Sequence, residues 1–85
     1  MSNAERVNEF LTKSQTFYLA TEDGSQPKCR PMGLHFLLDG VVYFGVGGFK
    51  EVFKQMQANP LVEICATVEH DFLRYYGKAV FETAD

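Results

Sequence analysis

Apolar residues recur along this chain with two periods, one typical of helices and one typical of strands. Helical spacing occurs twice, over residues 2–13 and 49–58. In the first stretch, Ser2 and Glu5 form the pattern of a capping box. The second stretch has an apolar stripe at i, i+3, i+4 and i+7, formed by Phe49, Val52, Phe53 and Met56. The pattern therefore predicts two short helices, each with one apolar face.

The remaining apolar stretches are rich in β-branched and aromatic residues, as strands are. Five strands are predicted, over residues 16–21, 28–38, 41–46, 61–68 and 73–82. The Asp-Gly pairs at 23–24 and 39–40 favour positive φ and predict hairpin turns. Because Pro31 cannot donate to a ladder, its strand is expected at an edge, a bulge or a break. The expected order is α-β-β-β-α-β-β, an antiparallel meander of the α+β class that is mainly β.

The length of 85 residues predicts a single domain over 1–85, with a thin core. Five strands of this length can curl into a partly closed barrel. The chain stops three residues after the last predicted strand, which leaves an edge strand unprotected. Since 46% of the residues are hydrophobic, apolar surface also remains for a partner subunit. A homodimer is therefore expected.

Charge and composition argue against several classes of protein. A net charge of −3 does not favour nucleic-acid binding, which needs a basic surface. No apolar run approaches the ~20 residues of a membrane span, and the N-terminus lacks the pattern of a signal peptide. A cytoplasmic protein without a membrane partner is expected. The two cysteines, Cys29 and Cys65, lie in apolar segments and are predicted to be reduced core residues, with a disulfide or redox pair as the alternative.

The most informative stretch is a strand that runs through a glycine pair, Gly47 and Gly48, into a helix. Unpaired N–H groups and the positive end of the helix dipole bind anions at such a place. The dipole disfavours Lys50 in the first helical turn, and a bound phosphate would reverse this effect. The alternative is an ordinary glycine loop, in which Glu51 and solvent balance the charge of Lys50.

A second cluster places Lys28 and Arg30 on one face of an otherwise apolar strand. If that strand lies beside the Gly47–Lys50 loop, Arg30 can make a bidentate contact with a phosphate. Otherwise the two residues form a solvated strand face. His35 and His70 are predicted to be ordinary surface, core or turn residues. The sequence has no catalytic triad, paired-carboxylate pocket or Walker A pattern, so a bound cofactor would have to supply the chemistry.

Four segments, in their order and spacing, resemble the pyridoxamine 5′-phosphate oxidase-like family. They are Cys29-Arg30-Pro31-Met32-Gly33, Val42-Tyr43-Phe44, residues 50–66 and residues 73–79. The resemblance spans residues 16–82. It implies an FMN-binding antiparallel split β-barrel with short helices, and two FMN molecules held at the interface of a homodimer.

The resemblance also implies where the flavin would bind. Arg30 would contact the phosphate region, the backbone of residues 31–34 would line the isoalloxazine ring, and the turn that leads to Lys50 would hold the phosphate. The cofactor-binding residues predicted in this way are Arg30, Pro31, Met32, Gly33, Leu34, Val46, Gly47, Gly48 and Lys50. No catalytic residue and no metal site is predicted.

This chain departs from the family pattern in two ways. Residues 46–49 replace the usual Thr or Ser and the polar residue after it, which removes about two phosphate hydrogen bonds, each worth roughly 1–3 kcal/mol. Weak binding or a different ligand is the consequence expected. The chain also stops before the helix and strand with which the family's barrel normally continues, so it is either truncated or unusually short.

The leading functional prediction is an FMN-dependent oxidoreductase that acts on an unknown small molecule. Arg30, Lys50 and main-chain amides would stabilise negative charge while the flavin carries electrons. True pyridoxamine-phosphate oxidase activity is not expected, because the longer C-terminal substrate motif of that enzyme is missing. One alternative is a dimerisation domain with an empty site, favoured by Val46 and Phe49. Another is a non-enzymatic module that binds FMN, deazaflavin or haem. The residues available as haem ligands are His35, His70, Met32 and Met56.

Overall fold

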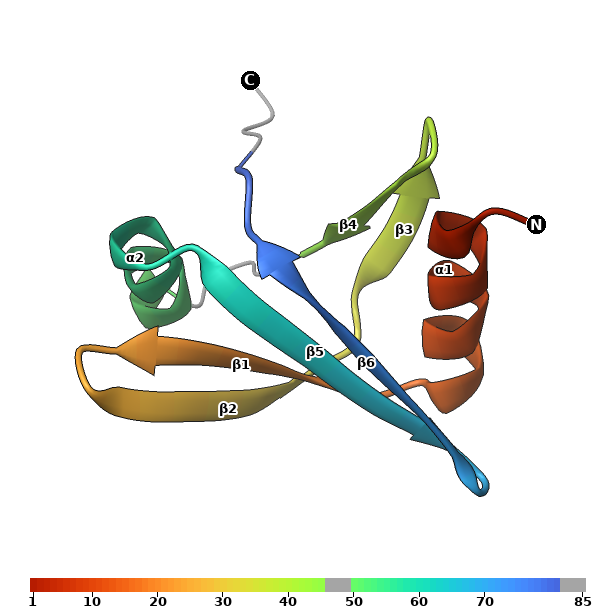
Figure 1. Cartoon of the computed structure of the whole chain (residues 1–85), viewed down its shortest axis with the longest axis horizontal. Coiled ribbons are helices and arrows are strands. Elements are labelled where there is room, and N and C mark those ends of the chain that lie inside the picture. The colour runs from red at the N-terminus through yellow and green to blue at the C-terminus, as the bar shows by residue number, and fades with distance from the viewer. Residues whose placement is uncertain (46–49, 82–85) are drawn as a thin grey trace.

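The computed structural model describes residues 1–45 and 50–81, which form two antiparallel sheets and two helices (Figure 1). The elements in chain order are α1 (Asn3–Ser14), β1 (Phe17–Asp23), β2 (Gln26–Met32), β3 (His35–Leu38), β4 (Val41–Phe44), α2 (Lys50–Ala58), β5 (Leu61–Val68) and β6 (Asp71–Lys78). One sheet has the strand order β2-β1-β5-β6, and the other is the hairpin β3-β4. The predicted α+β class, mainly β and antiparallel, is confirmed.

The single strand predicted over residues 28–38 is wrong, because the chain changes sheets at Gly33 and Leu34. β2 pairs with β1, with Met32 opposite Phe17, whereas β3 pairs with β4. The order in the described residues is therefore α-β-β-β-β-α-β-β. Pro31 lies in β2, at the edge of its sheet, where a residue without an N–H costs no ladder bond.

The turns follow the predicted chemistry with one addition. Asp39 and Gly40 both have positive φ, 51° and 78°, as the two-residue turn between β3 and β4 requires. Gly24, at φ 64°, begins the turn between β1 and β2. Glu69, at φ 54°, and His70 connect β5 to β6, so His70 is the turn residue that the sequence predicts.

The capping box at the start of α1 is present. The Ser2 hydroxyl accepts a hydrogen bond from the Glu5 N–H at 3.1 Å, and the Glu5 carboxylate accepts one from the Ser2 N–H at 2.9 Å. These contacts hold the pKa of the Glu5 carboxyl below its usual value. Among the described residues, no helix is long and apolar enough to cross a membrane.

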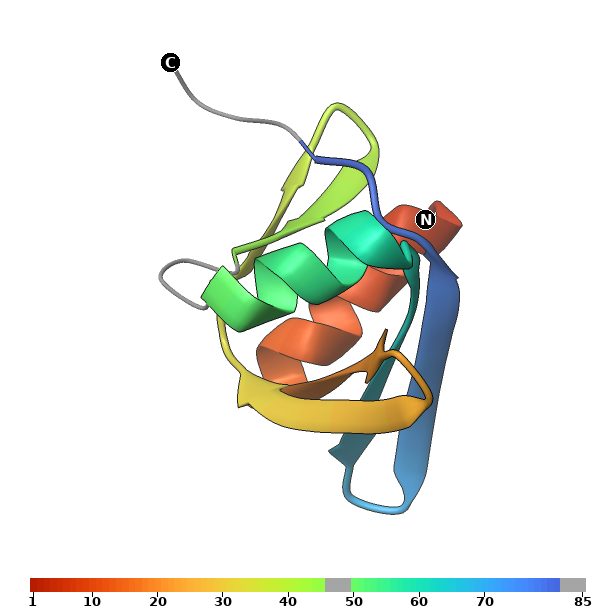
Figure 2. The ribbon, with the colours of Figure 1, turned by 90° about the vertical axis from the view of Figure 1, so that its left-hand side faces the viewer.

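A single core lies between the helices and one face of the four-stranded sheet. Figure 2 shows both helices on the same side of that sheet. The buried apolar residues are Val7, Leu11, Phe17, Leu19, Met32, Val52, Met56, Ile64 and Ala66. The stripe that predicted α2 thus supplies two of them, and Phe53 is partly buried beside them.

No helix within residues 1–45 and 50–81 covers the other face of this sheet, which carries both cysteines (Figure 2). Cys29 and Cys65 are free, as predicted, but they are exposed rather than buried in the core. They alternate with inward residues such as Met32 and Ile64, and therefore point to the uncovered face. Because β1 lies between them, the two strands are about 9–10 Å apart, and the backbones of the two cysteines are at least that far apart. This exceeds the reach of a disulfide, so the alternative of a bridged pair within the chain is wrong.

Candidate functional site

Arg30 extends from β2 toward α2 and joins three elements. Its Nη1 donates hydrogen bonds to the Thr21 hydroxyl at 2.7 Å and to the Leu19 carbonyl at 3.2 Å. Its Nη2 donates to Oε1 of Gln55, on α2, at 2.9 Å. The Thr21 hydroxyl in turn donates to the same Oε1 at 2.7 Å. We call Arg30, Thr21 and Gln55 the Arg30 cluster.

The electrostatics of the Arg30 cluster suit an anion. Arg30 is partly buried, and its partners are two neutral side chains and a backbone carbonyl. No carboxylate among residues 1–45 and 50–81 forms an ion pair with it. A guanidinium carries five N–H donors, of which these contacts use three. A phosphate would find a cation with donors to spare, so the donor set fits the phosphate of a flavin nucleotide.

The second predicted segment begins beside the connection between β2 and β3. The Gly45 N–H, just after β4, donates to the Leu34 carbonyl at 3.0 Å. A Cβ on Gly45 would lie 2.8 Å from Cγ of Leu34, so the close approach requires glycine or a shift of Leu34. Residues 46–49 lead from there to the start of α2. Val46, Gly47 and Gly48 lie outside the described residues, and so does the side chain of Lys50.

The structure therefore brings the segment of Arg30 and Leu34 into contact with α2, which follows residues 46–49, and with Gly45, which precedes them. Arg30 contacts α2 through Gln55, and Leu34 contacts Gly45. Residues 46–49 themselves, beside which the phosphate prediction places Arg30, lie outside the described residues.

The predicted site residues point in different directions. Met32 is buried in the core opposite Phe17, and its side chain is not available to a ligand. Pro31 is exposed on β2, and Leu34 is 61% exposed on the connection to β3. A ring beside residues 31–34 could therefore contact backbone groups and the exposed side chains of Pro31 and Leu34.

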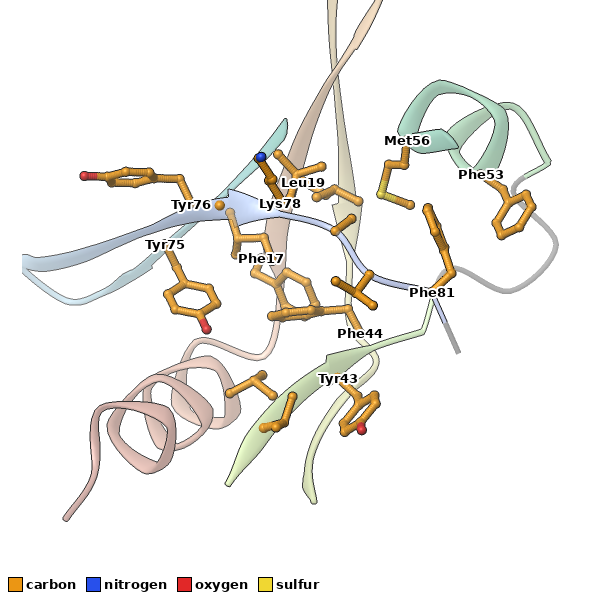
Figure 3. Close-up of a pocket in the computed structure, with 17 residues that line it drawn as sticks. Phe17, Leu19, Tyr43, Phe44, Phe53, Met56, Tyr75, Tyr76, Lys78 and Phe81 are labelled. Atoms are coloured by element: carbon orange, nitrogen blue, oxygen red, sulfur yellow. The ribbon is translucent and has the colours of Figure 1, made fainter. Parts of the chain in front are cut away.

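A groove that the sequence did not predict lies between β4 and the end of β6 (Figure 3). It has a volume of about 470 Å³, and its walls are mainly apolar. The aromatic residues that line it are Phe17, Tyr43, Phe44, Phe53, Tyr75, Tyr76 and Phe81. None of the described residues among the predicted cofactor-binding set lines it. The signal for it was the aromatic and small residues at alternate positions of the last predicted strand.

Two pairs of the aromatic residues that line this groove are in contact. Phe17 packs edge-on against Phe44, with ring centroids 5.6 Å apart, and Phe53 does the same against Phe81 at 4.9 Å. The groove opens between the four-stranded sheet and the β3-β4 hairpin, which do not pair with each other in the described part of the chain. The groove is thus a gap between sheets, separate from the Arg30 cluster.

The possible haem ligands, His35 among them, lie in the core, in contacts with neighbouring side chains or in a turn. Nδ1 of His35 lies 2.7 Å from Oδ1 of Asn8, its ring packs edge-on against Phe17, and burial lowers the pKa of the imidazole. Met32 and Met56 are buried in the core, and His70 is exposed in a turn. The described residues contain no group of three or more metal-ligating side chains.

Comparisons with known proteins agree with this architecture. The family model of pyridoxamine 5′-phosphate oxidase matches residues 4–85. Among solved structures, the chain is similar to a NimC/NimA family protein from Clostridium acetobutylicum, with a TM-score of 0.84 and 38% identity. That alignment covers 92% of this chain and 57% of the other, so this chain spans little more than half the length of that protein. No curated protein matches the chain.

The likeness in sequence and in fold covers nearly the whole chain. The predicted split-barrel fold is confirmed, although the two sheets are not closed against each other in the described residues. The resemblance seen in the sequence is confirmed as well. This chain belongs to the pyridoxamine 5′-phosphate oxidase-like family of flavin-binding split-barrel proteins.

Proposed function

We propose that this chain binds FMN and that Arg30 anchors the phosphate. The observation that carries the proposal is a partly buried guanidinium held by neutral acceptors, with two N–H donors unused by any described residue. A cation in this state attracts an anion more strongly than one already paired with a carboxylate. Membership in a flavin-binding family makes a flavin phosphate the anion of choice.

The start of α2 supports the same proposal. Gln55, which binds Arg30, lies five residues after Lys50, or about 7.5 Å along the helix axis. The positive end of the helix dipole and the Arg30 charge therefore act on one region. We expect Lys50 and the main-chain amides of Gly47 and Gly48 to contribute there as well.

The flavin ring would lie along the connection between β2 and β3, where Leu34 is exposed and backbone groups of residues 31–34 are accessible. A bound flavin supplies the electron or hydride transfer that no described side chain can carry out. Arg30 would stabilise negative charge on the cofactor. We propose on this basis an oxidoreductase that acts on a small molecule.

A homodimer completes the proposal. Apolar side chains are exposed along the β3–β4 hairpin and the segment that leads into it: Leu34, Phe36, Leu38 and Val41. A cluster of exposed apolar side chains is typical of an interface. A second copy would cover it beside the proposed ring site.

The absorbance spectrum of freshly purified protein, followed by titration with FMN, tests the proposal. We expect the two near-ultraviolet and blue bands of a flavin, or quenching of flavin fluorescence when FMN is added to colourless protein. A Soret band would indicate haem instead. Protein that is colourless, leaves added FMN fluorescent and sediments as a monomer would contradict the proposal.

A further inference from the structure

We infer that Gln55 and Thr21 are positioning residues that hold the Arg30 guanidinium in place while leaving its charge available to a phosphate. The inference rests on the proposed FMN binding and adds the residues that prepare the site. Neither residue was predicted as part of it. The sequence gives each an ordinary role, since Gln55 lies in a helix and Thr21 in a strand.

Burial is the first argument. Thr21 is 3% exposed and Gln55 is 8% exposed, and they are the buried polar side chains of the described chain. Their neighbours along the inward faces of the same elements, Leu19, Val52 and Met56, belong to the apolar core. Burying a hydroxyl and an amide there opposes folding unless both are hydrogen-bonded. Both form hydrogen bonds with Arg30 and with each other.

The direction of these hydrogen bonds is the second argument. Arginine only donates, so the atom of Gln55 that faces Nη2 is its carbonyl oxygen. That oxygen also accepts from the Thr21 hydroxyl, whose own lone pair accepts from Nη1 of Arg30. The three side chains therefore form a closed ring. The ring fixes one orientation of the guanidinium. The directions of the two N–H donors that remain are therefore fixed as well.

The third argument is charge. An Asp or Glu at either position would satisfy the same donors and neutralise Arg30. The neutral acceptors satisfy the donors and leave the full positive charge, which is what an anion site requires. A side chain already held in place also loses less conformational freedom when the ligand binds.

The test compares FMN with riboflavin, which lacks the phosphate, on the full chain. Gln55→Glu keeps the shape and the acceptor oxygen but pairs Arg30 with a carboxylate. We expect its FMN affinity to fall by about tenfold, its riboflavin affinity to stay within about twofold, and its melting temperature not to decrease. Gln57→Glu is the matched control, because Gln57 is exposed on the same helix. It should leave the affinity for FMN unchanged within about twofold.

Thr21 provides an independent pair of variants. Thr21→Val removes the hydroxyl and keeps the shape, and should lower FMN affinity several-fold with little effect on riboflavin. Thr21→Ser keeps the hydroxyl and should restore the FMN affinity of the parent. This pair also decides the matter if Gln55→Glu does not fold.

The outcomes separate this inference from the proposed function. A parent protein that does not prefer FMN over riboflavin overturns both. A parent that prefers FMN, while Gln55→Glu and Thr21→Val keep that preference undiminished, overturns only the inference and leaves the cluster a structural one. A loss in Gln57→Glu equal to that in Gln55→Glu would also overturn it, because the effect would then come from net charge.

Discussion

The Arg30 cluster and the aromatic groove lie on the same small scaffold, yet they are built in opposite ways. In the Arg30 cluster, three side chains from three elements are joined by directional hydrogen bonds between 2.7 and 2.9 Å. In the groove, aromatic walls meet without a ladder between the two sheets, and Tyr76 at its edge remains 74% exposed. Hydrogen bonds fix an orientation, whereas apolar burial does not. The Arg30 cluster therefore holds a cation in one orientation, whereas the groove offers apolar surface without a fixed orientation.

The largest effect is expected at the floor of the groove. Phe17 is fully buried and contacts both Phe44 and His35. Phe17→Ala should lower the free energy of unfolding by about 3–5 kcal/mol, because it removes a buried ring and leaves a cavity. Chemical denaturation measures this loss. Tyr76→Ala, at the exposed edge, should change stability by no more than about 0.5 kcal/mol. Equal losses in the two variants would show that the groove is not anchored at Phe17.

A smaller loss is expected in the Arg30 cluster. Gln55→Leu keeps apolar bulk but leaves Nη2 of Arg30 and the Thr21 hydroxyl without their acceptor. We expect the free energy of unfolding to fall by about 1–3 kcal/mol. Gln57→Leu, on the exposed side of α2, is the control, and its free energy of unfolding should differ from that of the parent by no more than about 0.5 kcal/mol. If Gln55→Leu is as stable as its control, the ring of hydrogen bonds does not stabilise the fold.

A pH effect is expected at His35, which lies between α1 and the floor of the groove. Burial lowers the pKa of His35 in the folded state, so the unfolded chain takes up the proton first as pH falls. Its contribution to stability is therefore present above its ordinary pKa of 6.5 and is lost as pH falls below that value. The melting temperature of the parent should fall more between pH 7 and pH 5 than that of His35→Gln. The melting temperature of His70→Gln, a change in an exposed turn, should fall with pH as much as that of the parent. Parallel curves for His35→Gln and the parent would contradict this.

The smallest effects are expected at the cysteines on the uncovered face of the sheet. Cys29→Ser and Cys65→Ser should each change stability by no more than about 0.5 kcal/mol, since both side chains are exposed. Both thiols should react with a thiol reagent in the native protein. A native protein with fewer than two accessible thiols per chain would place a covering surface over that face.

Local patterns predicted those parts of the fold that depend on neighbouring residues. The capping box at Ser2, the apolar stripe of α2 and the Asp39-Gly40 turn are set by short-range geometry. The box and the turn are present, and the stripe is present in its described members, which exclude Phe49. The break at Gly33 was missed because apolar and polar residues go on alternating through it. The cysteines were misplaced because alternation assigns residues to faces without saying which face the helices cover.

The residues of the candidate site also divide into those with a local sequence signal and those without one. The sequence predicted a phosphate site at Arg30 and the segment that leads to Lys50, because cations and glycines beside a helix start have a recognisable chemistry. Thr21 and Gln55 had no such signal, since their role depends on three elements that meet only in the folded chain. The groove likewise requires two sheets whose separation no local pattern encodes.

The most direct test of the central claim is the ratio of FMN to riboflavin affinity, measured by quenching of flavin fluorescence in the parent, in Arg30→Ala and in Arg74→Ala. Arg74 is exposed and paired with Glu63 on β5, so it controls for loss of an arginine elsewhere. We predict that the parent and Arg74→Ala bind FMN at least about tenfold more tightly than riboflavin, and that Arg30→Ala loses most of this preference. Equal ratios in Arg30→Ala and the parent would show that the phosphate is bound elsewhere.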